Sequence, residues 1–321
     1  MTAAASAAGS AAESAGSAGS AGGPVADGMH GLAGSYGDEL AVVTVTYSPG
    51  EVLDTFLDTL AGATRRTLRV IMADNGSTDG APERAAAARD GVCLLPTGGN
   101  LGYGTAANRA VASLPPEYGW VMIANPDIEW TPGALDTLLA ATRRWPSGGA
   151  FGPLIREPDG RVYPSARLLP SLGRGIGHAL LGKLWPANPW TRGYRQAAAA
   201  PAERTAGWLS GSCLLARRAA FDAIGGFDER YFMYFEDVDL GARLGEAGWH
   251  NVYVPAAEVV HLGGHATSRV SARMLAEHHR STYRYLAGRY RGPWHAPLRL
   301  ALRLGLAARC RLAVRAARRS G

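Results

Sequence analysis

The residues best suited to chemistry are carboxylates that follow short apolar runs. Asp74 ends one run, Asp127 ends another, and Glu236 and Asp237 follow an aromatic stretch at residues 231–235. An Asp at a strand end can accept hydrogen bonds from a base or a ribose. Carboxylates with apolar neighbours have a raised pKa, which suits a general base. Each acid also has a purely structural explanation, as a turn residue or a helix cap.

Asp127 and His261 could together hold a divalent cation. Both follow apolar runs, Asp127 within Asn125-Pro126-Asp127 and His261 beside two glycines. Mg²⁺ and Mn²⁺ prefer oxygen ligands and bridge to diphosphate oxygens, and imidazole is an acceptable further ligand for Mn²⁺. We therefore expect a metal site here, and we keep an Asx turn or a helix cap as the alternative for Asp127.

A glycine-rich segment at residues 98–104, Gly-Gly-Asn-Leu-Gly-Tyr-Gly, precedes a predicted helix. Glycines before a helix N-terminus allow close approach of a diphosphate, whose charge the helix dipole favours. Gly102, Gly104 and Ala107 also match the dinucleotide pattern G-x-G-x-x-A, with Asp127 downstream as a ribose acid. A nucleotide-binding dehydrogenase is therefore an alternative interpretation.

The elements that must position these side chains alternate between strand and helix. This alternation predicts βαβ units, and hence an α/β fold whose central sheet is mostly parallel and flanked by helices. In such sheets the ligand lies beyond the carboxyl ends of the strands. The expected strands are residues 40–47, 68–73, 92–95 and 120–124, with helices at 51–62, 82–88 and 105–114. Regular structure is expected to continue at 207–217, 221–248 and 252–262.

Residues 151–196 interrupt this alternation and are rich in Pro, Gly and Arg. They are expected to form a long, partly irregular insertion of the kind that covers a site or binds a partner. The N-terminal residues 1–37 are mostly Ala, Ser and Gly and predict a disordered segment. We expect the folded domain at 38–277 and an Arg-rich helical tail at 278–321.

Composition excludes several classes of protein. The chain has 321 residues, of which 47% are hydrophobic, so it is not disordered throughout, and its three cysteines are too few for a disulfide scaffold of this length. Cys93, Cys213 and Cys310 show no metal-type spacing, which favours a reducing cytosolic compartment. No apolar run is long enough for a membrane-spanning helix.

The net charge of +6 is concentrated in the tail, which contains many arginines and no acid after Glu277. Several arginines could hold the chain at an anionic membrane surface. Leucine and arginine do not separate on a helical wheel of residues 298–312, so we predict electrostatic attachment without a well-formed amphipathic anchor. A solvated tail and an oligomer contact are the alternatives, and no nucleic-acid recognition motif accompanies the charge.

The ordered set of motifs resembles the family 2 glycosyltransferases of the GT-A fold, and more closely their rhamnosyltransferase branch. The resemblance covers residues 40–267. The motifs that carry it are Thr46-Tyr47, Asp74-Asn75-Gly76-Ser77, Asn100-Leu101-Gly102-Tyr103-Gly104 with Asn108, Asn125-Pro126-Asp127, Gly226-Phe227-Asp228-Glu229, Phe235-Glu236-Asp237-Val238-Asp239 and His261. The family's usual D-x-D metal motif has Asn125 in place of its first acid here.

The resemblance implies a Rossmann-like GT-A domain that uses a nucleotide-sugar donor and a divalent metal, Mg²⁺ or Mn²⁺. Asp237 would be the catalytic general base, and Asp127 and His261 would hold the metal. The nucleotide-sugar would lie against Thr46, Tyr47, Asp74, Asn75, Asn100, Gly102, Asn108 and Asn125. The acceptor would contact Phe227, Asp228 and Glu236.

The activity implied is inverting transfer of L-rhamnose from dTDP-L-rhamnose to a lipid-diphosphate-linked N-acetylglucosamine, in cell-wall or polysaccharide assembly. Such an enzyme would be cytoplasmic and peripheral at the inner face of the cell membrane, with no nucleic-acid partner. A related transferase that moves another hexose from a UDP sugar to a polysaccharide is the first alternative. A noncatalytic binding protein is a further one, beside the dehydrogenase.

Overall fold

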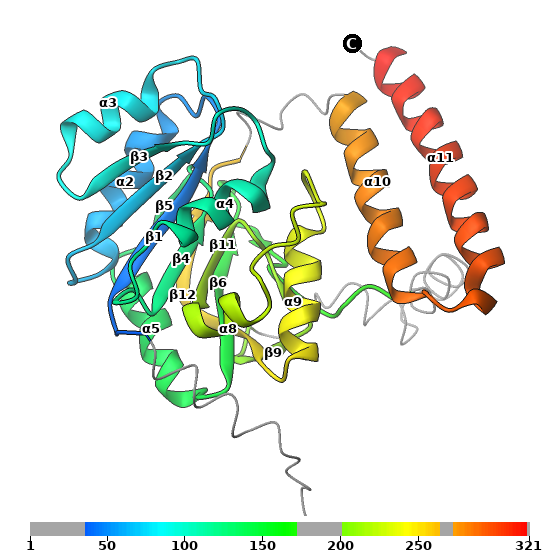
Figure 1. Cartoon of the computed structure of the whole chain (residues 1–321). Helices are drawn as coiled ribbons and strands as arrows, with labels where there is room; N and C mark the ends of the chain where they lie inside the picture. The colour runs from blue at the N-terminus through cyan, green and yellow to red at the C-terminus, as the bar shows by residue number, and fades with distance from the viewer. Residues whose placement is uncertain (1–35, 172–200, 264–271, 320–321) are drawn as a thin grey trace, which may run out of the picture.

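The computed structural model describes residues 36–171, 201–263 and 272–319, and its centre is a twisted ten-stranded sheet (Figure 1). The main strand order is β3-β2-β1-β4-β11-β6-β12-β5, with β7 paired to β6 and β9 paired to β12. The strands are β1 Leu40–Thr46, β2 Arg69–Asp74, β3 Val92–Pro96, β4 Trp120–Ala124, β5 Ile128–Trp130, β6 Gly148–Arg156, β7 Val162–Tyr163, β9 Arg204–Ala206, β11 Cys213–Arg217 and β12 His250–His261. A separate pair is formed by β8 Ala166–Arg167 and β10 Trp208–Leu209.

Helices cover both faces of the sheet. One face packs in a core with α2, α3 and α5, and the other packs with α4, α8 and α9. The two cores bury alternate residues of the same strands, such as Val42 on one face and Val43 on the other. The helices are α2 Val52–Ala63, α3 Ala81–Ala88, α4 Tyr103–Ala112, α5 Ala134–Arg144, α8 Arg218–Ala223, α9 Glu236–Glu246, α10 Ala272–Arg289 and α11 Ala296–Arg319, with a 3-10 turn η1 Pro293–His295.

The predicted mostly parallel α/β sheet is confirmed. Strands β3, β2, β1 and β4 run parallel to one another, and β6 runs parallel to β12. Strand β11 lies antiparallel between β4 and β6. The carboxyl ends of β1, β2, β4 and β12 therefore share one edge with the amino end of β11, and we call it the carboxyl edge.

The interpretation of residues 151–196 as an irregular insertion is wrong at its beginning. Strand β6 lies in the sheet between β11 and β12, and most of it is buried. Its glycines face bulky partners: a Cβ on Gly149 would lie 2.7 Å from Cβ of Trp249, and one on Gly152 would lie 3.0 Å from Leu209. Glycine is therefore needed here for packing between elements. The later part of the predicted insertion, 172–196, lies outside the described residues.

The folded domain begins earlier than residue 38. The Tyr36 hydroxyl donates to Oδ2 of Asp222 at 2.6 Å, and the Gly37 N–H donates to the Pro116 carbonyl at 3.0 Å. Residues 36 and 37 are thus part of the domain, and the rest of the predicted disordered segment lies outside the described residues.

The predicted boundary between residues 277 and 278 falls inside α10. Helices α10 and α11 contact each other along their lengths and form a hairpin beside α9 (Figure 1). Tyr285 of α10 is buried in a cluster with Val238 and Ala242 of α9, which anchors the hairpin to the domain. Within the part of the chain that the structure describes, no helix combines the length and the apolar character needed to cross a bilayer.

Candidate active site

Asp74 closes the turn after β2 with its own carboxylate. Its Oδ1 accepts from the Thr46 hydroxyl at 2.8 Å and from the Ser77 hydroxyl, and its Oδ2 accepts from the N–H groups of Gly76 at 3.1 Å and Ser77 at 3.0 Å. Thr46 has no exposed surface. These two predicted nucleotide-binding residues therefore build the turn, and Thr46 offers no surface to a ligand.

The Asn75 side chain likewise forms hydrogen bonds within the protein. Its Nδ2 donates to the Gly102 carbonyl at 3.2 Å, and its Oδ1 accepts from the Thr97 hydroxyl at 3.0 Å. The side chain is buried and joins the β2 turn to the loop before α4. Tyr47 is 57% exposed, and Asn100 is also exposed, so these two predicted binding residues have surface available for a ligand.

Gly102 is required for contact between two loops. Its φ is 88° and its ψ is 169°, a region that only glycine adopts readily, and a Cβ there would lie 2.3 Å from the Phe232 carbonyl oxygen. The neighbouring Tyr103 N–H donates to the same oxygen at 3.1 Å. The expectation that Gly102 makes room for a diphosphate is therefore wrong. Gly98 and Gly99 also have positive φ, and a Cβ on either would meet no atom within 4 Å.

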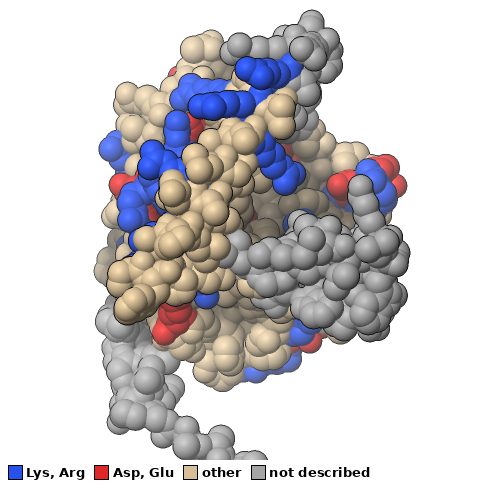
Figure 2. Space-filling model, turned by 90° about the vertical axis from the view of Figure 1, so that its right-hand side faces the viewer, with Lys and Arg blue, Asp and Glu red and all other residues tan. Residues whose placement is uncertain are grey.

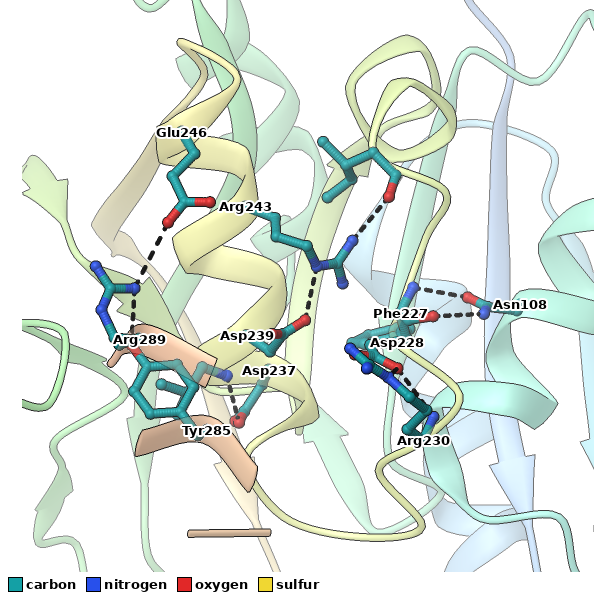
Figure 3. A network of polar contacts seen from close by, with 12 residues as sticks. Asn108, Phe227, Asp228, Arg230, Asp237, Asp239, Arg243, Glu246, Tyr285 and Arg289 are labelled. Carbon is teal, nitrogen blue, oxygen red and sulfur yellow. Dashed lines mark hydrogen bonds and ion pairs between the residues drawn. The ribbon is translucent and has the colours of Figure 1, made fainter. Parts of the chain in front are cut away.

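Asn108 holds the backbone of Phe227 through both ends of its amide (Figure 3). Its Nδ2 donates to the Phe227 carbonyl at 2.9 Å, and its Oδ1 accepts from the Phe227 N–H at 2.9 Å. The Phe227 ring is 1% exposed and packs against Tyr103 and Phe221. The predicted nucleotide contact of Asn108 and the predicted acceptor contact of Phe227 are both corrected: these residues position α4 against the loop that precedes α9.

Asn125, Asp127 and His261 meet at the carboxyl edge because β12 pairs with β5, His261 opposite Ile128. Nε2 of His261 lies 3.0 Å from Oδ1 of Asp127 and 3.4 Å from Nδ2 of Asn125. One ring nitrogen cannot donate to the carboxylate and accept from the amide at once, so His261 Nε2 can satisfy only one of these two neighbours. No set of three His, Cys, Asp or Glu side chains suitable for a metal occurs within the described ranges.

This donor set fits a divalent cation that takes its remaining ligands elsewhere. One carboxylate oxygen and one imidazole nitrogen converge, with an amide beside them. Mg²⁺ and Mn²⁺ are commonly held by one or two protein ligands together with substrate phosphates and water. Asp127 and His261 could hold such an ion only with a phosphate-bearing ligand present.

Asp237 lies in the first turn of α9 and faces the segment before β11. Its Oδ2 accepts from the Gly211 N–H at 3.0 Å, and its Oδ1 accepts from the Val238 N–H at 2.8 Å. Burial raises the pKa of Asp237 above its usual range, and the two N–H groups partly oppose this rise by stabilising the carboxylate. A carboxylate with a raised pKa and few partners is well suited to accept a proton.

Glu236, the neighbouring acid, is more deeply buried. Its Oε2 has no hydrogen-bond partner, and burial, followed by the charge of Asp237, raises the pKa of Glu236 to about 8. The backbone before it is unusual, because Tyr234 and Phe235 both have φ of 67°. Strained conformations of this kind gather at functional sites. Burial therefore disfavours a negative charge on Glu236 beside Asp237.

The other acids of this cluster have structural partners (Figure 3). Asp228 forms an ion pair with Arg230, which holds the pKa of the Asp228 carboxyl below its usual range. Asp239 pairs with Arg243 at 2.6 Å, and Arg243 also donates to the Ile224 carbonyl. Asp228, which is predicted to contact the acceptor, is thus already paired with Arg230, whereas Asp239 stabilises α9.

Tyr103 shows that the metal-type group and Asp237 belong to one site. Burial raises the pKa of the Tyr103 hydroxyl, and the charges of Glu236, Asp237 and Asp127 raise it further. That hydroxyl donates to the Gly211 carbonyl at 2.6 Å, while the Gly211 N–H donates to Asp237. The structure therefore brings together acids that lie more than a hundred residues apart in sequence.

Sequence reasoning missed three residues of this site: Tyr103, Gly211 and Arg167. Arg167 stacks on the rings of Tyr163 and Trp208, and its charge lowers the pKa of Asp237. It lies in the segment 151–196 that was expected to cover a site, which is the one signal that pointed to it. Nothing in the local sequence distinguishes Gly211 from other glycines.

Comparison with known proteins gives a consistent assignment. The family model for glycosyl transferase family 2 matches residues 41–225, and a second, for glycosyltransferase-like family 2, matches residues 182–283. The N-acetylglucosaminyl-diphospho-decaprenol L-rhamnosyltransferase of Mycobacterium tuberculosis is 59% identical over 291 residues, 88% of this chain and 95% of the relative. A rhamnosyltransferase of Escherichia coli strain K12 is 31% identical over 60% of this chain and 72% of its own length.

Among solved structures, the mannosyltransferase PcManGT of Pyrobaculum calidifontis, in complex with GDP-Man and Mn²⁺, matches 91% of this chain and 82% of its own. The TM-score is 0.53 at 16% identity, so this likeness concerns the fold. It agrees with the predicted GT-A architecture.

Proposed function

This chain belongs to glycosyl transferase family 2 and is a glycosyltransferase, and from that premise we propose that it transfers L-rhamnose. The donor would be dTDP-L-rhamnose and the acceptor an N-acetylglucosamine on a lipid diphosphate. The observation that carries the proposal is the 59% identity to a relative that bears this activity in its name, over 95% of that relative's length. The resulting product would serve cell-wall or polysaccharide assembly.

In the proposed reaction the acceptor hydroxyl attacks the anomeric carbon of the donor sugar. Asp237 takes the proton from that hydroxyl as the new carbon–oxygen bond forms, and the bond to the nucleoside diphosphate breaks. Its raised pKa and its few partners support this role. Displacement by the acceptor itself inverts the anomeric configuration.

Asp127 and His261 would hold a divalent metal, Mg²⁺ or Mn²⁺, with Asn125 beside them. When bound, the metal supplies positive charge that stabilises the departing diphosphate. The convergence of Asp127 Oδ1 and His261 Nε2 at 3.0 Å, with the Asn125 amide beside them, supports this assignment.

The nucleotide would lie over the turns after β1, β2 and β3. Tyr47 and Asn100 have exposed side chains for direct contact, and Gly98 and Gly99 leave open space above their backbone. Asp74, with Thr46 and Asn75 behind it, would present the Gly76 and Ser77 turn to the base. The acceptor would approach from the side of Glu236 and Arg167, with Asp228 at the margin.

We further propose that the enzyme works at the inner face of the cytoplasmic membrane, where a lipid-linked acceptor is accessible. A transferase that moves another hexose from a UDP sugar is the second candidate, because the residues proposed to bind the nucleotide do not by themselves select dTDP-L-rhamnose over a UDP sugar. Family membership argues against the dehydrogenase and the noncatalytic protein.

The test is release of nucleoside diphosphate by purified protein with Mg²⁺ or Mn²⁺. We would compare dTDP-L-rhamnose with UDP-glucose and UDP-galactose, each with and without a prenyl-diphospho-N-acetylglucosamine. The proposal predicts dTDP release that depends on the acceptor and fails when the metal is chelated. Faster turnover with a UDP sugar would overturn the donor assignment and retain the fold and the base.

A further inference from the structure

The outward side of α11 carries exposed leucines that none of the described residues covers. Leu298, Leu302 and Leu306 are half-buried, while Leu300, Leu304 and Leu312 are 57%, 62% and 66% exposed. Spacings of four and eight residues place the three exposed leucines in a stripe on one side of the helix, with Arg311 and Arg315 between them.

Large exposed apolar side chains are concentrated in this part of the molecule. Within the described residues they are Tyr47, Val162, Leu168, Trp294, Leu300, Leu304 and Leu312, and the last four belong to the end of the α10–α11 hairpin and to α11. Trp294 is 89% exposed, in the turn η1 that joins the two helices. Exposed apolar side chains gathered in one part of a molecule indicate an interaction surface.

The charge around the stripe identifies its partner. Residues 272–315 contain ten arginines and a single acid, Glu277, and Figure 2 shows basic side chains gathered over this side of the molecule. Arg311 and Arg315 lie exposed next to Leu304 and Leu312. A second copy of the chain would bring these arginines face to face, whereas an anionic bilayer offers both lipid phosphates for the arginines and acyl chains for the leucines.

We propose that the exposed stripe of α11, with Trp294 and the flanking arginines, inserts into the headgroup region of an anionic membrane. The biological purpose of this insertion rests on the proposed function. Burial of apolar side chains would add to the electrostatic attachment that the sequence predicts. The stripe contributes apolar burial and the arginines contribute attraction to lipid phosphates. Tryptophan at the hairpin turn suits the membrane–water boundary.

The hairpin is joined directly to the segment that leads into the catalytic base. The Ser281 hydroxyl donates to the Met233 carbonyl at 2.9 Å, and His278 stacks on Tyr234 at 5.4 Å between ring centroids. Other α10 side chains contact the remaining residues of 231–235: Arg273 over Phe232, Arg284 over Tyr231 and Tyr285 against Phe235. Docking of α11 would therefore fix the acceptor side of the site at the level of the lipid headgroups.

The experiment is co-sedimentation of the full chain with vesicles of phosphatidylcholine, with and without phosphatidylglycerol. The triple variant Leu300→Ser, Leu304→Ser, Leu312→Ser should bind the anionic vesicles at least about tenfold more weakly, from the loss of apolar burial. The matched control Val162→Ser, Leu168→Ser replaces exposed apolar residues elsewhere and should bind as the wild type does. Arg311→Gln, Arg315→Gln should weaken binding to anionic vesicles and reduce its dependence on salt.

Activity separates this inference from the proposed function. With a short-chain acceptor in solution, the triple variant should turn over as the wild type does, and with acceptor embedded in vesicles it should be slower. No binding of wild type to anionic vesicles, equal loss in the control variant, or a dimer that the serines dissociate would overturn the inference. Vesicle binding by a protein that transfers no sugar to either acceptor would overturn the proposed function and leave the membrane surface standing.

Discussion

At the β2 end of the carboxyl edge, Asp74 accepts hydrogen bonds from two hydroxyls and two backbone N–H groups. At the α9 end of the same edge, Asp237 accepts from two backbone N–H groups, and Glu236 has a buried oxygen without a partner. The two regions therefore use the same kind of side chain differently. A satisfied acid builds a rigid turn, whereas a desolvated acid with few partners retains capacity for proton transfer.

The largest effect should come from Asp237→Asn, which removes the proposed base and keeps the side-chain shape. We expect turnover to fall by about 10²- to 10⁴-fold, the usual contribution of a general base, with little change in thermal stability. Acceptor-dependent dTDP release and a melting curve measure the two quantities. Asp159→Asn, which removes an exposed acid paired with Arg161, is the control and should retain activity. Equal turnover in both variants would contradict the assignment.

The converse substitution, Asp74→Ala, should mainly affect stability. It leaves the Thr46 hydroxyl and the turn N–H groups without their acceptor. We expect the free energy of unfolding to drop by about 2 to 4 kcal/mol, since each buried donor left unpaired costs roughly 1 to 3 kcal/mol. Denaturant unfolding should show a larger loss for Asp74→Ala, which leaves four donors without their acceptor, than for Asp237→Ala, which leaves two. The opposite ranking would break the comparison between the two regions.

Gly102 is the point where the two regions touch, through Phe232. Gly102→Ala should lower stability by about 1 to 3 kcal/mol from backbone conformation, and further through the overlap with the Phe232 carbonyl. Gly98→Ala provides the matched comparison, because its φ is 82° and a Cβ there would meet no atom within 4 Å. Chemical denaturation should rank Gly102→Ala as the less stable of the two variants. Equal stability would mean that the close contact between Gly102 and Phe232 does not require glycine.

A further prediction concerns pH. Burial raises the pKa of Glu236 from 4.5 to about 8, so between these values the folded state binds more protons than the unfolded state. Stability should therefore fall as pH rises from 4.5 to about 8. Glu236→Gln removes this titration and should flatten the dependence of the melting temperature on pH over that window. An unchanged slope in the variant would place the titrating group elsewhere.

Much of the fold follows from the sequence. Strands β1 to β4 and their helices were predicted within two residues at most ends, because each strand is a short apolar run between turn residues. Strand β6 was missed, since its glycines and proline weaken the strand signal. Those glycines serve packing against Trp249 and Leu209, which are distant in sequence. Only the tertiary structure contains that information.

The location of the site could be predicted from the sequence. Which of its residues face a ligand and which support the backbone was harder to predict. The ends of β1, β2, β4 and β12 do meet, as parallel topology requires. Whether Asn108 contacts a ligand or a backbone depends on which loop packs opposite it, and here the loop is that of Phe227. Gly211 contributes only its backbone N–H and carbonyl groups, which no residue type reveals in advance.

The central claim is that Asp237 deprotonates an acceptor that attacks the sugar directly. The most direct measurement is the anomeric configuration of the product, determined by NMR after turnover of dTDP-L-rhamnose with the N-acetylglucosamine acceptor. Direct attack with Asp237 as the base predicts a new linkage whose configuration is inverted relative to the donor. A retained configuration would mean that the sugar passes through a second displacement, and it would contradict the role assigned to Asp237.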